Sequence, residues 1–192
     1  VFFNGGTGSL VAGAHWVLFY YQSGGTKNWG WSDDGTSSSE FTYNWDYTAD
    51  TDWHHIAMCR QSGTYRFYID GTQRVGTTTG GSQNLSGTTN FLLGSGYGDF
   101  SGYMDEVRYS DTCRYPNGTS FTPYTSALTA DVNTKLLLHC DGSDSGTTFT
   151  DSSWTGTPRH TITANGNTTN TRISNHPVTA NGHAHIIGPK VG

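Results

Sequence analysis

The chain has 192 residues, of which 10 are Lys or Arg and 15 are Asp or Glu, so its formal net charge is −5. No cluster of basic residues occurs along the sequence, and we therefore expect no nucleic-acid partner. The most apolar run, residues 10–21, is interrupted by Gly13 and His15, and it is too short and too polar to insert into a membrane. With 26 glycines, 14% aromatic and only 13% charged residues, the composition is typical of an all-β protein and excludes a disordered chain.

Two β-strands are predicted early in the chain, at residues 17–22 and 41–44, where aromatic and β-branched residues gather. Residues 23–40 between them are rich in Gly and Ser. We expect this stretch to be a loop region, and it contains Trp29-Gly30-Trp31.

The clearest local signal is a hairpin at residues 52–70. Two runs of alternating residues, 52–60 and 65–70, flank the turn Gln61-Ser62-Gly63-Thr64, and the second run leads into Asp70-Gly71. A period of two with aromatic and β-branched residues, bounded by Gly, predicts an antiparallel hairpin with one face in a core.

Further short strands are expected along the rest of the chain, with Gly-rich turns between them. A loop is predicted at residues 75–87, and strands are predicted at 91–94, 103–109, 135–141 and 160–164. Regularly spaced short strands with glycine turns predict a sandwich or jelly roll.

The three cysteines, Cys59, Cys113 and Cys140, match no metal-binding spacing. Their odd number argues against a secreted domain in which every cysteine is paired. We expect small buried thiols.

Three motifs give the chain a resemblance to a known family. The strand at residues 53–57 reads Trp-His-His-Ile-Ala, residues 68–71 read Tyr-Ile-Asp-Gly, and residues 102–108 read Gly-Tyr-Met-Asp-Glu-Val-Arg. They resemble the laminin-G-like, concanavalin A-like jelly-roll modules. The resemblance implies an all-β, antiparallel β-sandwich, completed by strands of a neighbouring module or chain.

The order of the motifs suggests tandem repetition. In the modules it resembles, a Leu-Leu-Leu-His-x-Asp-Gly strand opens the fold and the Met-Asp-Glu-Val-Arg strand closes it, whereas here the opening motif at 136–142 comes second. We therefore interpret residues 1–127 as the C-terminal part of one module. Residues 128–192 are interpreted as a linker and the opening strands of a second module. The strands at 135–141 and 160–164 are expected to complete the first unit or to pair with another chain.

A sugar-binding surface is one interpretation of the polar region before residue 53. Indole faces stack on sugar rings, and neighbouring carboxylates can hydrogen-bond hydroxyls. The candidate ligand-binding residues are Trp29, Trp31, Asp33, Asp34 and Trp45. The alternative is that the tryptophans belong to the sandwich core.

A metal site is a second candidate. If residues 103–108 alternate regularly, Asp105 faces the core with Val107, and His55 is a candidate partner for it. Calcium takes carboxylate and carbonyl oxygens on loops, and the candidate ligands are Asp105, Asp141, Asp144 and Asp151. The alternatives are a structural Asp105 and a zinc site formed by His139, His160, His183 and His185.

Catalysis has little support in the sequence. A glycosidase on this fold needs two positioned carboxylates, but the only glutamates, Glu40 and Glu106, are far apart, and Asp105 and Glu106 are adjacent. We expect no enzyme activity.

The resulting prediction is a non-enzymatic recognition or adhesion module that binds a glycan or a host-surface receptor through loop aromatics. Tandem modules of this kind are familiar in tail and fibre proteins of bacteriophages, so the resemblance implies a virion or an extracellular or cell-surface location. An architectural role, in which the chain contacts copies of itself or other virion proteins, is the alternative. Calcium is the cofactor that this interpretation allows, and a carbohydrate-active enzyme is the third function class.

Overall fold

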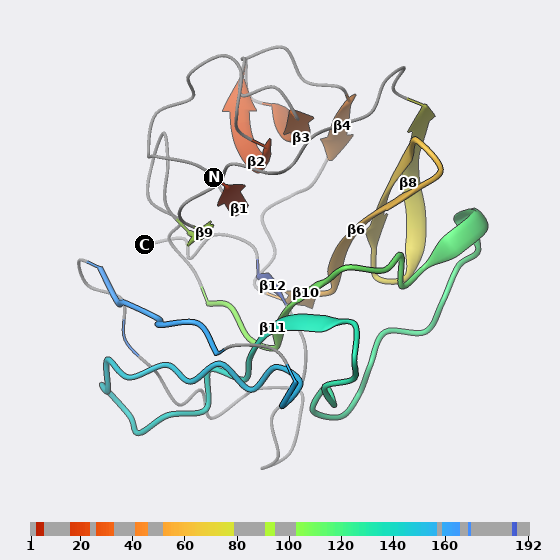
Figure 1. Cartoon of the computed structure of the whole chain (residues 1–192). Helices are drawn as coiled ribbons and strands as arrows, with labels where there is room; N and C mark the ends of the chain where they lie inside the picture. The colour runs from red at the N-terminus through yellow and green to blue at the C-terminus, as the bar shows by residue number, and fades with distance from the viewer. Residues whose placement is uncertain are drawn as a thin grey trace.

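A computed structural model describes residues 3–5, 16–23, 26–32, 41–45, 52–78, 91–94, 103–156, 159–165, 169 and 186–187. Within these residues the chain consists of short β-strands and connections, and its helical content is one 3-10 turn at Pro116–Gly118. The strands form antiparallel sheets, which confirms the predicted all-β sandwich class (Figure 1). No helix in this described part is long and apolar enough to cross a membrane.

The larger sheet contains five of the described strands in the order β4–β3–β2–β1–β9. These strands are β1 (Phe3–Gly5), β2 (Trp16–Ser23), β3 (Thr26–Ser32), β4 (Phe41–Trp45) and β9 (Phe91–Leu93). The strands predicted at 17–22, 41–44 and 91–94 are confirmed. The loop predicted at 23–40 is wrong for residues 26–32, because Trp29 and Trp31 alternate around Gly30 with the period of a strand.

The second sheet is formed by β6 (Ile56–Gln61), β7 (Thr64–Ile69) and β8 (Thr72–Thr78). Both of its connections are tight turns in which two successive residues have positive φ, 49° and 79° at Ser62-Gly63 and 52° and 74° at Asp70-Gly71. This conformation matches the right-handed twist of the flanking strands, so the predicted hairpin is confirmed. The loop expected from residue 75 begins later, because β8 continues to Thr78.

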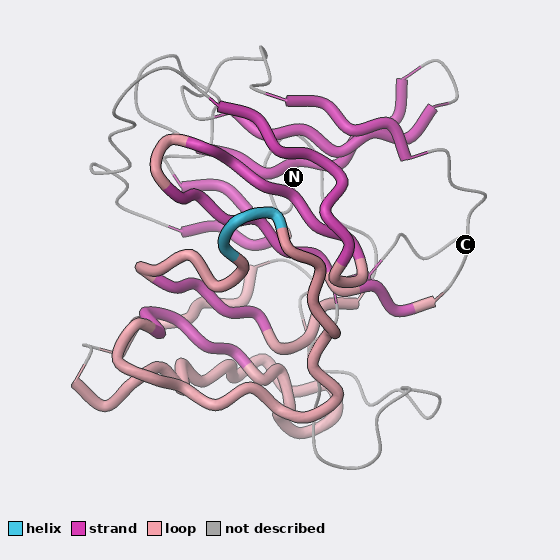
Figure 2. Tube along the Cα trace, turned by 90° about the vertical axis from the view of Figure 1, so that its right-hand side faces the viewer, coloured by secondary structure: helices cyan, strands magenta, loops and turns pink. Residues whose placement is uncertain are grey.

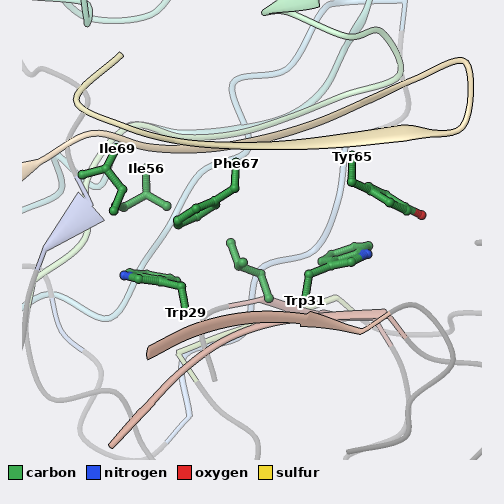
Figure 3. Packing of buried hydrophobic residues seen from close by; sticks show 7 residues of the cluster. Trp29, Trp31, Ile56, Tyr65, Phe67 and Ile69 are labelled. Carbon is green, nitrogen blue, oxygen red and sulfur yellow. The ribbon is translucent and has the colours of Figure 1, made fainter. Parts of the chain in front are cut away.

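The core lies between these two sheets (Figure 3). Trp29 and Trp31 point from β3 toward the inner face of β7, where the Trp29 ring lies 5.4 Å from the Phe67 ring and the Trp31 ring lies 5.2 Å from the Tyr65 ring. These four side chains are at most 3% exposed. Tilted contacts between large aromatic rings therefore join the two layers, together with Leu18, Ile56 and Ile69 of the same core.

Two strands from the last third of the chain pair with strands from the first part. β10 (Val107–Ser110) pairs antiparallel with β11 (Thr134–Leu138), and β12 (Ile186–Ile187) pairs with β5 (Trp53–His54). The segment after residue 128 therefore contributes to the same sheets as the segment before it. The strand predicted at 160–164 is wrong, since these residues are irregular, although Ile162 packs against the β10–β11 cluster.

A connecting segment crosses the outer face of β6 and β7. Residues 111–121, here called the strap, carry the 3-10 turn that is cyan in Figure 2. The Tyr68 hydroxyl donates to the Tyr115 carbonyl at 2.8 Å, and the Phe121 N–H donates to the Gly71 carbonyl at 2.9 Å. A Cβ at Gly71 would lie 1.7 Å from the Phe121 oxygen, so only glycine permits this approach.

Candidate ligand-binding loop

Asp151 fastens the chain after β11 to the sheet. Its carboxylate is buried and accepts hydrogen bonds from the N–H groups of Leu137, Ser153 and His160, at 3.2, 2.9 and 2.9 Å. The His160 Nδ1 atom lies 2.8 Å from the same carboxylate. One side chain thus holds both ends of the segment formed by residues 151–156, Arg159 and His160, here called the Trp154 loop.

Trp154 projects from this loop toward solvent with 41% of its surface exposed. It is the exposed tryptophan among the residues whose burial the structure describes. A Cβ built on Gly156 would lie 3.3 Å from both Cδ1 and Nε1 of the indole, so the ring packs closely over a glycine. Exposed Arg159 donates to the Asp151 carbonyl, and the His160 side chain is 54% exposed.

The electrostatics of the loop favour an ionised Asp151. Burial by itself raises the pKa of this carboxyl, but hydrogen bonds from the His160 backbone and ring, the Ser153 N–H and the Leu137 N–H lower it to about 2. At neutral pH the carboxylate is charged and accepts a hydrogen bond from His160 Nδ1–H. The Nε2 atom of a neutral His160 ring is then an acceptor on the far side of the imidazole.

The loop therefore offers the groups that a sugar-reading surface uses. An indole presents a flat apolar face, and the imidazole of His160 and the guanidinium of Arg159, which belong to the same loop, can form hydrogen bonds with hydroxyls. Because Asp151 holds the loop backbone, little ordering entropy remains to be lost when a ligand binds.

A second carboxylate–histidine pair lies at the β10–β11 junction. The Glu106 side chain is fully buried, with Oε1 2.7 Å from His139 Nδ1 and Oε2 accepting from the Leu128 N–H at 2.8 Å. Both oxygens are engaged, so this pair ties β10, β11 and the connection between them. Its role in the structure is a buried polar link.

Comparison with known proteins places the fold. A family model described as the concanavalin A-like lectin/glucanases superfamily matches residues 1–117. The chain belongs to this superfamily. Neither the curated proteins nor the solved structures give a match.

Of the five ligand-binding residues predicted from the sequence of this concanavalin A-like chain, the structure describes the side chains of two. Trp29 and Trp31 are 2% and 3% exposed, so the structure supports the alternative that they belong to the core. Asp33, Asp34 and the side chain of Trp45 lie outside the described residues, and their sugar-binding role stays a prediction.

Asp105 does not take the place that regular alternation predicts for it. Glu106 has a φ of 51°, which interrupts the strand, so β10 begins only at Val107. Glu106 and Val107 are both buried, whereas Asp105 is half-buried and accepts from the Glu106 N–H at 2.9 Å. The buried carboxylate of this strand is therefore Glu106, and its histidine partner is His139, where the sequence suggested Asp105 and His55.

The four candidate calcium ligands do not form a described cluster. Asp141 and Asp144 are exposed, and Asp151 is occupied by the hydrogen bonds given above. In the part of the chain that the structure describes, no three His, Cys, Asp or Glu side chains gather as metal ligands do. His183 and His185 lie outside that part. Calcium and zinc stay predictions.

Sequence reasoning missed Trp154. Its surroundings carry a usable signal, because Asp151, two serines, Gly156 and Pro158 form a cluster of turn residues around a single large aromatic.

Proposed function

We propose that this chain is a non-enzymatic recognition module that binds glycans through the Trp154 loop. The observation that carries the proposal is an indole with 41% exposure on a segment that Asp151 holds in place. Membership of a superfamily described as lectins and glucanases is compatible with a carbohydrate ligand.

Binding would use stacking of one sugar face on the indole, with hydroxyls directed to His160 and Arg159. Removal of a stacked aromatic ring at the centre of a contact commonly costs on the order of 1.5–3 kcal/mol, which corresponds to roughly tenfold to 150-fold in affinity. A single module of this kind binds weakly, and repetition multiplies the contact.

A glycan array followed by calorimetry tests the proposal. Trp154→Ala should reduce the affinity for the sugars that the unmodified chain binds by at least roughly tenfold. Tyr109→Ala is the matched control, since Tyr109 is similarly exposed at 39% but lies on β10. Equal loss in both variants, or no sugar bound by the unmodified chain, contradicts a site at Trp154.

The absence of catalysis is part of the proposal. Glu106, one of the two glutamates, has both carboxylate oxygens bonded inside the protein and its side chain fully buried, so it is poorly placed to protonate a glycosidic oxygen. Glu40 lies outside the described residues. Release of reducing ends from polysaccharides, abolished by Glu106→Gln, would contradict this part.

The setting we propose is a virion or an extracellular or cell surface, as the sequence resemblance to phage tail and fibre proteins implies. A purely architectural role predicts a different effect of the same substitution. Trp154→Ala would then change self-association, measured by analytical ultracentrifugation, and no sugar would bind.

A further inference from the structure

The outer face of the β6–β7 hairpin carries a buried cysteine beneath the strap. Ile56 and Met58 point into the core between the sheets, so the alternation of β6 directs Cys59 to the opposite face. Cys59 is nevertheless only 7% exposed. The strap covers it, since Tyr115 accepts from the Tyr68 hydroxyl and the Asn117 N–H donates to Gln61 Oε1 at 3.2 Å.

The strap brings a second cysteine to the same place. Cys113 is half-buried and lies two residues before Tyr115 in the strap. Burial and the proximity of Cys113 both raise the pKa of the Cys59 thiol. Arg114 is itself anchored by two hydrogen bonds to Asp131, at 2.5 and 2.6 Å. The strap therefore holds Cys113 against the face of the hairpin on which Cys59 is buried.

We propose that Cys59 and Cys113 form a disulfide under oxidising conditions and that this bond staples the strap to the hairpin. The third cysteine remains a thiol. The Cys140 Sγ atom lies 4.0 Å from the Leu138 carbonyl, in the cluster around β10 and β11.

The oxidation needs an external disulfide such as glutathione disulfide. The Cys113 thiolate attacks one glutathione sulfur and releases a glutathione thiolate, and Cys59 then displaces the second glutathione from Cys113. Two thiol protons leave, two electrons pass to glutathione disulfide, and one sulfur–sulfur bond forms. Cys113 reacts first because it is half-buried, whereas burial and the neighbouring Cys113 raise the pKa of Cys59 to about 12.

The bond would close a loop of about 55 residues. Closure of a loop of this length restricts the unfolded chain strongly, and in a protein of this size the expected rise in melting temperature is roughly 10 °C.

Peptide mapping tests the proposal directly. Trypsin separates the three cysteines onto peptides 28–60, 109–114 and 136–159. The intact folded chain is incubated with glutathione disulfide, remaining thiols are alkylated under denaturing conditions, and the digest is analysed by mass spectrometry. We expect peptides 28–60 and 109–114 to be linked, with a loss of about 2 Da, and peptide 136–159 to be alkylated.

Two variants separate the bond from other effects of oxidation. Cys140→Ala keeps the pair, so its melting temperature should rise on oxidation as it does in the unmodified chain. Cys113→Ser should show no rise. Three results would overturn the proposal: full alkylation of all three cysteines after oxidation, a link that includes peptide 136–159, or a disulfide that forms only between chains. All three are measured on the unmodified chain, so they do not depend on whether a variant folds.

Discussion

Asp151 shows how one residue can position a site that it does not form. Its carboxylate collects three backbone N–H groups and one imidazole, and Trp154 projects from the segment so held. An asparagine has the same shape but replaces one acceptor oxygen with a donor, which would face an N–H group.

Asp151→Asn should therefore lower the free energy of unfolding by about 2–3 kcal/mol at pH 7. Because the pKa of Asp151 is lowered to about 2, its stabilisation is fully present above the unfolded value near 4 and is lost as the pH falls through about 2. Urea unfolding at pH 7, 4 and 2.5 should show the difference between the two proteins shrinking as the pH falls. Asp141→Asn, at an exposed carboxylate, is the control and should change stability by less than about 0.5 kcal/mol.

At position 71 the structure requires glycine. Its φ of 74° and the Phe121 oxygen, which would lie 1.7 Å from an added Cβ, both exclude a side chain. Gly71→Ala should cost at least about 2 kcal/mol, because left-handed strain adds to the displacement of the strap. In Gly76→Ala the new methyl group meets only the flexible end of Gln73, so its effect should stay near 0.5 kcal/mol or less. Similar melting temperatures for the two variants would contradict this account.

At the scale of elements, the two layers depend on the tryptophans of β3. Trp29→Ala should lower the free energy of unfolding by about 3–5 kcal/mol, since it removes a buried ring in contact with Phe67. Trp154→Ala removes a ring of the same type from the surface and should change stability by less than about 1 kcal/mol. Chemical denaturation of both variants distinguishes a core indole from a loop indole.

The sequence predicts those elements whose signal is local. The hairpin at 56–69 has the correct alternation and turn residues, so its strands, its turn at Ser62-Gly63 and the following turn at Asp70-Gly71 were predictable. β3 was missed because Gly and Ser dominate its flanks, and the burial of its indoles depends on β7, which is distant in the chain. The φ of 51° at Glu106 likewise has no signal in the residue type, so the alternation argument failed there.

The candidate site was predictable only in kind. An aromatic loop surface was expected from the sequence. Which tryptophans reach solvent, however, depends on contacts between segments that are distant in the chain, and local sequence patterns do not predict these contacts. Trp29 and Trp31 are buried by β7, whereas Trp154 lies in a turn that Asp151 holds at the surface.

At the scale of the whole molecule, β11 links the two segments that the sequence suggested as parts of separate modules. Its three leucines, Leu136, Leu137 and Leu138, are at most 7% exposed, and each is worth about 2 kcal/mol of burial. Without β11, Val107 and the edge of β10 would lose their partner.

A chain of residues 1–127 should therefore be markedly less stable than the intact protein and should bind a hydrophobic dye. Addition of a separate chain of residues 128–192 should restore the melting temperature by forming a one-to-one complex. A fragment 1–127 that melts at the temperature of the intact chain would show instead that the later segment is an independent unit.

The strap contact at Gly71 also bears on the order in which the protein assembles. Gly71 and Phe121 are 50 positions apart, whereas β6, β7 and β8 join through two-residue turns. Hairpins form within microseconds from neighbouring residues, but docking of the strap must wait for a long loop to close. Changes that weaken the strap should consequently accelerate unfolding and leave the refolding rate nearly unchanged, so its detachment would be the first event when this protein opens.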